Sequence, residues 1–158
     1  MTWRDLRDLA AGSRACVRWL RERDPVEVGL ALFAADARAA TRGTPSRYTV
    51  RVASTAERPR PVKLLLDFYA LNPRPGTDGH YAYLGHSLRV PPRAATTVEI
   101  RYDWERGARL SWDDVSIRAE QVWRGAEGLP RVYAVYALVL DPAGAELDRL
   151  VIAQELRG

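Results

Sequence analysis

The stretch "RVYAVYALVLD", from Arg131 to Asp141, decides the fold because it reads as a strand with no polar face. Successive side chains of a strand point to opposite sides, so the stretch divides into two rows. Both rows are apolar: Val132, Ala134, Tyr136, Leu138 and Leu140 form one, and Tyr133, Val135, Ala137 and Val139 form the other. An exposed Tyr133–Val139 row would be a large apolar patch. We therefore expect one row to pack against a second sheet and the Tyr133 row to be covered by other residues.

Several further segments alternate between apolar and polar residues, which indicates half-buried strands. These segments are 47–54, 62–71, 81–90, 96–104 and 146–156. The sequence Asp141-Pro142-Ala143-Gly144 predicts a hairpin turn before the last of them, with proline at the second turn position. Closely spaced strands separated by turns are typical of an antiparallel sandwich.

The segment 111–125 has two interpretations. Ser111 and Asp114 fit a helix capping box, whereas Val115, Ile117 and Ala119 alternate as in a strand. The strand is slightly favoured because it can pair with the next element. Whether residues 115–123 form strand or helix stays open.

The N-terminal residues have a helical apolar period. A first helix is expected from Thr2 to about Arg23, where Thr2 and Asp5 make a capping box. A second is expected from Asp24, a good N-cap followed by Pro25, and Gly43 can end it. The alternative is a strand, since residues 26, 28, 30 and 32 also alternate. The start signal favours the helix.

The predicted fold is thus mainly β: an antiparallel immunoglobulin-like sandwich of about seven strands with an N-terminal helical hairpin. The expected division is 1–43 for the helical segment and 44–158 for the sandwich. The section from Arg47 to Trp104 resembles the immunoglobulin-like modules common in bacterial proteins, although the Cys…Trp…Cys signature is absent. We expect the helices to cover the outer face of the sheet that holds Val132–Leu140; a docked partner chain is the alternative.

Composition narrows the function. The 158 residues carry a net charge of +4 and a single cysteine, Cys16, so no disulfide within the chain is possible. Lys63 is the only lysine, and acids balance the arginines along the chain, so no specific nucleic-acid partner is expected. There is no secretory h-region and no run of about 20 apolar residues. A cytoplasmic protein is therefore expected.

No catalytic constellation is recognisable. His80 and His86 would lie about 20 Å apart on one strand, too far to share a metal. Cys16 has no histidine near it and is expected to be a buried, inert thiol. Carboxylates gather near two tryptophans without specific spacing, at Asp103, Glu105, Asp113 and Asp114. We expect no enzyme, no cofactor and no metal.

Two sets of residues could bind a partner. Arginines recur at helical spacing in the first segment, at Arg4, Arg7, Arg14, Arg18 and Arg21. Tyr81, Tyr83 and Arg89 share the outward phase of one strand and could stack on a ligand. The sequence therefore predicts a non-catalytic protein–protein interaction module, an adaptor or accessory subunit of a bacterial assembly, with a protein partner or self-association. The alternatives are a carbohydrate-binding sandwich and a peripheral membrane-surface protein that uses the basic first helix.

Overall fold

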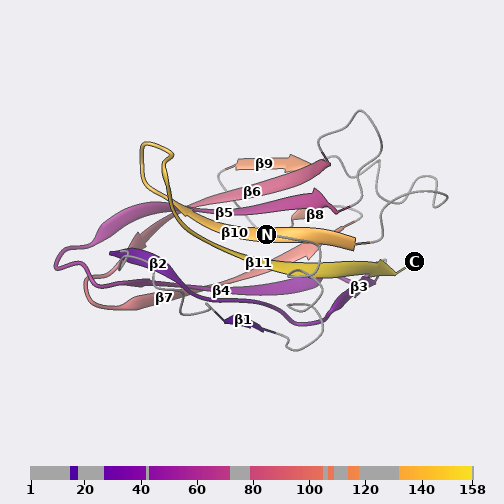
Figure 1. Cartoon of the computed structure of the whole chain (residues 1–158), viewed down its shortest axis with the longest axis horizontal. Helices are drawn as coiled ribbons and strands as arrows, with labels where there is room; N and C mark the ends of the chain where they lie inside the picture. The colour runs from indigo at the N-terminus through magenta and orange to yellow at the C-terminus, as the bar shows by residue number, and fades with distance from the viewer. Residues whose placement is uncertain are drawn as a thin grey trace.

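The chain folds into two packed β-sheets (Figure 1). The computed structural model describes residues 15–17, 27–41, 43–71, 79–104, 107–108, 114–117 and 132–157, and no helix occurs among them. A five-stranded sheet has the order β1-β2-β4-β7-β8, and a six-stranded sheet has the order β3-β11-β10-β5-β6-β9. All neighbours are antiparallel except β3 and β11, which are parallel. The mainly β, sandwich-like prediction is confirmed.

The strands of the five-stranded sheet are β1 (Ala15–Val17), β2 (Val28–Ala35), β4 (Ser46–Ser54), β7 (Ala95–Asp103) and β8 (Gly107–Ala108). Those of the six-stranded sheet are β3 (Ala39–Thr41), β5 (Arg60–Ala70), β6 (His80–Val90), β9 (Asp114–Ile117), β10 (Val132–Leu140) and β11 (Glu146–Arg157). The five alternating segments are thus confirmed as strands. The turn at Asp141 is confirmed as well, because Gly144 N–H donates to Asp141 O at 3.0 Å.

The expected helical hairpin is not found among those of its residues that the structure describes. Residues 28–35, expected in the second helix, are strand β2, which pairs with β4. A β-bulge between Leu30 and Leu32 explains the misleading pattern. The extra residue makes Leu30 and Phe33, three positions apart, both point into the core, which imitates helical spacing.

The first expected helix is contradicted at residues 15–17, which form β1 and pair with β2. Its other residues, 2–14 and 18–23, lie outside the described residues. The expected boundary at residue 43 falls between β3 and β4, strands of the two different sheets. For the ambiguous segment, residues 114–117 are strand β9, and residues 118–123 lie outside the described part.

The two apolar rows of β10 have the opposite roles from those expected from the sequence. The Tyr133, Val135, Ala137 and Val139 row belongs to the core between the sheets. Its phase follows from the pairing with β5, where Val135 lies opposite Phe68 and Val139 opposite Leu64. The opposite sheet therefore covers this row, and no lid is needed there. The row facing outward is the one that contains Ala134 and Tyr136.

Aromatic rings fill the centre of the core. Phe68 stacks on Tyr102 at 4.6 Å between ring centroids and meets Trp104 edge-on at 5.2 Å. Trp104 in turn contacts Tyr133 at 5.0 Å. These rings come from both sheets, so they join the two layers.

Tyr133 provides a test of this packing. Burial raises its pKa to about 12 from the usual 10.0. Between pH 10 and about 12 the unfolded chain loses the Tyr133 proton while the folded chain keeps it, so stability falls as the pH rises. We expect Tyr133→Phe to make the free energy of unfolding decline less steeply over this range. Urea unfolding at a series of pH values measures it, and parallel declines for both proteins would refute the assignment.

Candidate functional site

The outer face of the six-stranded sheet carries a row of rings, which we call the aromatic strip: Tyr69, His80, Tyr83 and Tyr136. Strand pairing brings these residues together from β5, β6 and β10. Tyr69 lies opposite His80 on one side and Ala134 on the other. A bulge at Tyr69, which leaves Tyr81 as the extra residue of β6, turns His80 to this face. The four side chains are half-buried.

The rings of the aromatic strip contact each other in sequence across the strands. Tyr136 meets Tyr69 edge-on, with 5.9 Å between centroids and 88° between planes. Tyr69 is 5.0 Å from His80, and His80 is 6.3 Å from Tyr83 at an angle of 18°. The strip is therefore a continuous cluster of rings rather than a set of isolated side chains.

Polar and charged side chains lie at both ends of the aromatic strip. His80 Nε2 lies 2.7 Å from Asp67 Oδ1, and their side chains are only 21% and 17% exposed. At the other end, the guanidinium of Arg149 lies 5.8 Å from the centre of the Tyr136 ring, a cation–π geometry. The hydrogen bond from Arg149 to Glu146 raises the pKa of the guanidinium above its usual value. The face thus offers ring surfaces next to the His80–Asp67 hydrogen bond and the Arg149–Glu146 ion pair.

A small apolar base lies beside the strip. Ala134 and Val151 are buried on this outer face, and Tyr136 and Leu71 pack against them. Buried apolar groups and half-buried rings next to ion pairs suit stacking and hydrogen bonding to a ligand.

The structure brings together only some of the residues that the sequence predicted to form binding sites. Tyr83 belongs to the aromatic strip, but Arg89 is six residues further along β6, about 20 Å away at 3.3 Å per residue. Tyr81 lies in β6, and its side chain is outside the described part. The five arginines of the predicted stripe, Arg4, Arg7, Arg14, Arg18 and Arg21, all lie outside the described residues. Partner binding through that stripe stays a prediction, as does the membrane-surface alternative that rests on it.

The other residues singled out from the sequence do not form a second site. His80 pairs with Asp67, while His86 lies opposite Leu64 in the inward phase, as expected. Asp103 and Trp104 are buried at the end of β7. The side chains of Glu105, Asp113, Asp114 and Cys16 are outside the described part. Among the described residues, no group of three His, Cys, Asp or Glu side chains could hold a metal ion.

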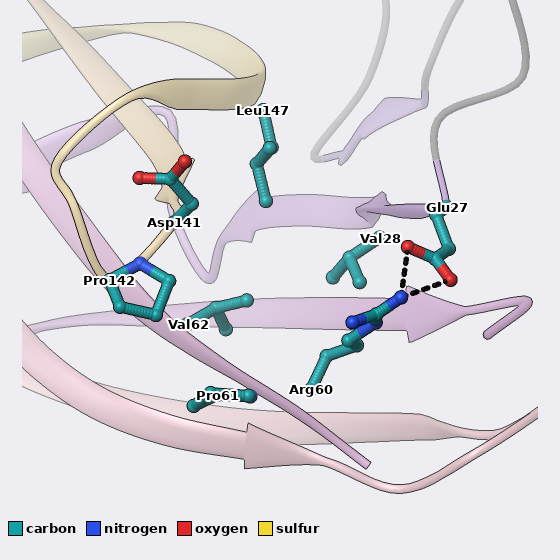
Figure 2. Close-up of a pocket in the computed structure, with 8 residues that line it drawn as sticks. All are labelled: Glu27, Val28, Arg60, Pro61, Val62, Asp141, Pro142 and Leu147. Atoms are coloured by element: carbon teal, nitrogen blue, oxygen red, sulfur yellow. Dashed lines mark hydrogen bonds and ion pairs between the residues drawn. The ribbon is translucent and has the colours of Figure 1, made fainter. Parts of the chain in front are cut away.

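A separate cavity of about 290 Å³ lies at one end of the sandwich (Figure 2). Val28, Val62 and Leu147 supply apolar walls, with Pro61 and Pro142 beside them. Its charged lining residues are Glu27, Arg60 and Asp141.

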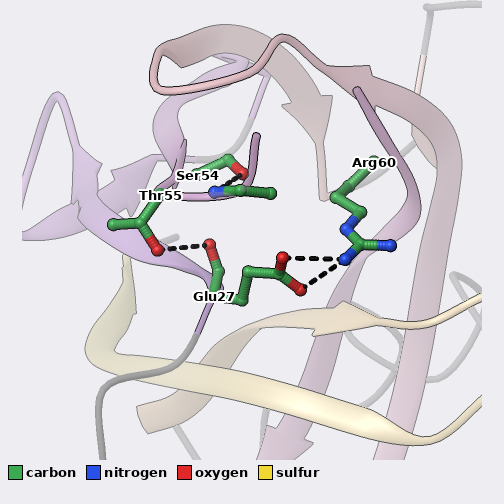
Figure 3. Close-up of polar contacts among 5 residues, drawn as sticks. Glu27, Ser54, Thr55 and Arg60 are labelled. Carbon is green, nitrogen blue, oxygen red and sulfur yellow. Dashed lines mark hydrogen bonds and ion pairs between the residues drawn. The ribbon is translucent and has the colours of Figure 1, made fainter. Parts of the chain in front are cut away.

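These charges already have structural partners. Glu27 accepts two hydrogen bonds from Arg60, at 2.7 and 2.9 Å, which links the start of β2 to the start of β5 (Figure 3). The backbone of Glu27 also accepts a bond from Thr55 N–H at 2.9 Å. Asp141 Oδ1 accepts the Ala145 N–H of its own turn at 2.8 Å. The charged residues that line the cavity are therefore held in structural contacts at this end of the sandwich. The aromatic strip is the better candidate site.

Sequence reasoning missed Asp67, Tyr69 and Tyr136. Tyr69 and Tyr136 could have been found from one signal, because each is an aromatic residue in the strand phase opposite to the core row. That signal required the phase of β10, which its uniform apolarity conceals.

Comparison with known proteins supports the fold. No protein-family model matches the sequence, and no curated protein matches it. Among solved structures, the chain is similar to part of the alkylpurine DNA glycosylase AlkC of Pseudomonas fluorescens bound to DNA, with TM-score 0.52 and 15% identity over 85% of this chain and 32% of that chain. It is similar to part of a glycosyl hydrolase family 2 member from Bacteroides cellulosilyticus, with TM-score 0.50 and 14% identity over 84% and 16% of the two chains.

A third neighbour is a Paenibacillus cycloisomaltooligosaccharide glucanotransferase complexed with cycloisomaltoheptaose, with TM-score 0.50 and 10% identity over 80% and 13% of the chains. The chain thus spans a third or less of the length of these three proteins. At these identities the likeness shows the fold alone. No helix among the described residues is long and apolar enough to cross a membrane. The chain has the fold of a β-sandwich domain that occurs within larger enzymes.

Proposed function

We propose that this chain is a non-catalytic binding module that contacts a protein partner through the aromatic strip, as an adaptor or accessory subunit of a bacterial assembly. The observation that carries the proposal is that tyrosines, Arg149 and a small apolar base lie together on one face of the sheet. Tyrosine and arginine are enriched in the cores of protein interfaces and dominate their binding energy. The polar contacts at the margin, His80–Asp67 and Arg149–Glu146, match the polar rim of such interfaces.

The geometry of the rings favours a protein over a flat polysaccharide. A sugar-stacking platform needs open ring faces, but Tyr69 and Tyr136 meet edge-on and Arg149 lies over the Tyr136 ring. Such an uneven cluster suits the varied side chains of a protein surface.

The proposal predicts a large loss of binding from one substitution. Tyr83→Ala removes a ring of the aromatic strip, and we expect at least about a tenfold loss of partner affinity, as for an interface hot spot. The measurement is a quantitative pull-down from an extract of the source cells, with mass spectrometry of the recovered proteins. Arg89→Ala is the control, because Arg89 shares the strand and face but lies outside the strip. Equal recovery with both variants would reject the strip as the interface.

Carbohydrate binding is the second candidate, and one observation favours it. The His80 and Tyr83 rings are nearly parallel, at 18°, and the Asp67 carboxylate lies beside them. Aromatic rings and carboxylates are common partners of sugar rings and hydroxyls. The likeness to the glucanotransferase complexed with cycloisomaltoheptaose fits this reading. Calorimetric titration with isomalto-oligosaccharides separates the two candidate functions. A saturable heat of binding that Tyr83→Ala abolishes would support carbohydrate binding. The absence of any heat of binding would favour the protein partner.

A further inference from the structure

Among the described residues, most of strand β7 forms an edge of the five-stranded sheet. Residues 95–102 pair with β4, and on the other side β8 pairs with Tyr102 and Asp103. Within the part of the chain that the structure describes, no strand pairs with the far side of residues 95–101. Unpaired N–H and C=O groups along such an edge are a template for another strand.

Several of the usual protections of an edge strand are missing from β7, although Glu99 and Arg101 are charged. Natural edges are blunted by charged side chains, especially lysine, by proline, by bulges or by very short strands. Residues 95–101 contain neither proline nor lysine, and their pairing with β4 runs without a register shift. By contrast, β11 is approached by β2, whose Leu30 N–H donates to Asp148 Oδ2 at 2.9 Å. The β7 edge is therefore a better acceptor for an added strand than the β11 edge.

The side chains of β7 define what such a strand must carry. Thr97, Glu99 and Arg101 are exposed on the outer face of the sheet. Val98 points the other way and is only partly buried, packed at the margin of the core. An added strand would thus place one set of side chains beside Glu99 and Arg101 and the alternate set beside Val98.

The charges on this face are unbalanced. Arg101 lies directly opposite Arg47 of β4, and both side chains are exposed. Like charges directly opposite each other are destabilising. Arg47 has Asp36 as a distant partner at 3.9 Å, whereas Arg101 forms no ion pair within the described residues. A carboxylate on the other side of Arg101 would offset this repulsion.

We propose that β7 accepts an extended segment of a partner protein as an added antiparallel strand, with a carboxylate opposite Arg101 and an apolar residue in the phase of Val98. The main-chain groups of the edge supply affinity, and Arg101 and Glu99 set the register. This site lies on the sheet opposite to the aromatic strip, so it stands independently of the function proposed above.

A second copy of the chain fits the edge less well. Antiparallel pairing of two β7 strands brings Glu99 opposite Arg101 only if Val98 faces Tyr102 and Thr97 faces Asp103. Tyr102 and Asp103 are already paired with β8. The register that uses residues 95–101 of both copies instead places Arg101 opposite Ala95 and gains no ion pair. A partner segment with its own sequence is not bound by this constraint.

The test uses the full chain and two labelled peptides of equal composition. In Asp-Val-Lys-Val-Thr-Val-Thr, antiparallel pairing places Asp opposite Arg101 and Lys opposite Glu99. In Lys-Val-Asp-Val-Thr-Val-Thr, the same pairing places like charges opposite each other. Fluorescence anisotropy should show that the first peptide binds at least about fivefold more tightly, since each cross-strand charge pair changes sign. Hydrogen exchange should show new protection of amides within residues 95–101.

Charge-swapped proteins make the result specific. The double variant Glu99→Arg, Arg101→Glu should prefer the second peptide. Arg51→Glu alters an equally exposed arginine one strand further in and should keep the original preference. Circular dichroism checks that each variant is folded. The proposal is overturned by absence of binding at millimolar peptide, by equal affinity for both peptides, by protection of other strands, or by a dimer whose residues 95–101 are protected without peptide.

Discussion

Replacing Phe68 by alanine is expected to lower the free energy of unfolding by about 3–5 kcal/mol, the cost of removing a buried phenylalanine from a packed core. Phe68 is fully buried and contacts Tyr102, Trp104 and Tyr48. Because these three rings come from the opposite sheet or its end, the substitution leaves a cavity between the two layers. Rigid rings around the cavity cannot collapse to fill it, which places the loss toward the upper part of this range.

Urea unfolding followed by tryptophan fluorescence measures this loss, because Trp104 lies in the same cluster. Leu65→Ala is the matched control. Leu65 lies on the same strand but points to the outer face, where it is half-buried, so we expect a loss well below that of Phe68→Ala. Equal losses for the two variants would show that the aromatic cluster does not hold the sheets together.

Replacing Asp148 by alanine is expected to cost about 2–3 kcal/mol, because it leaves a buried donor without its acceptor. Asp148 is 3% exposed. Its Oδ2 accepts the Leu30 N–H at 2.9 Å, and its Oδ1 accepts the Arg149 N–H at 3.0 Å. The first bond links β11 of one sheet to the bulge of β2 in the other. Its loss therefore weakens a connection between sheets as well as a single hydrogen bond.

The conservative substitution separates the acceptor from the side-chain volume. Asp148→Asn keeps one oxygen that can accept the Leu30 N–H, so we expect a smaller loss than for alanine. Urea unfolding at neutral pH measures both variants. If asparagine and alanine destabilise equally, the hydrogen bond to β2 is not what Asp148 contributes.

The sequence predicted the strands whose two faces differ. In β4, Tyr48, Val50 and Val52 alternate with Arg47, Thr49 and Arg51, so both the strand and its buried face could be predicted, and both are confirmed. The strand structure of β2 and the orientation of β10 could not be predicted. The bulge of β2 moves Phe33 into the phase of a helix, and β10 has two apolar rows whose orientation depends on its neighbours. In each case a contact distant in sequence decided the outcome.

The candidate site was harder to predict for the same reason. Tyr83 was identified from its strand phase, but Tyr69 and Tyr136 come from strands whose order in the sheet is not written in any local pattern. His80 reaches the aromatic strip only because of a bulge that the sequence around it does not signal.

The link between β2 and β11 has a consequence for how the chain folds. The Leu30 N–H and the Asp148 carboxylate are 118 positions apart, and β3, which follows β2 after three residues, pairs with residues 155–157. On a ribosome, β3 and Leu30 of β2 are made long before β11, which supplies the strand partner of β3 and the acceptor for the Leu30 N–H. Contacts this remote slow folding, and they leave early strands exposed to wrong pairings meanwhile. Refolding of this chain should therefore be slow for its size, and a chaperone that shields β2 during synthesis should raise its yield.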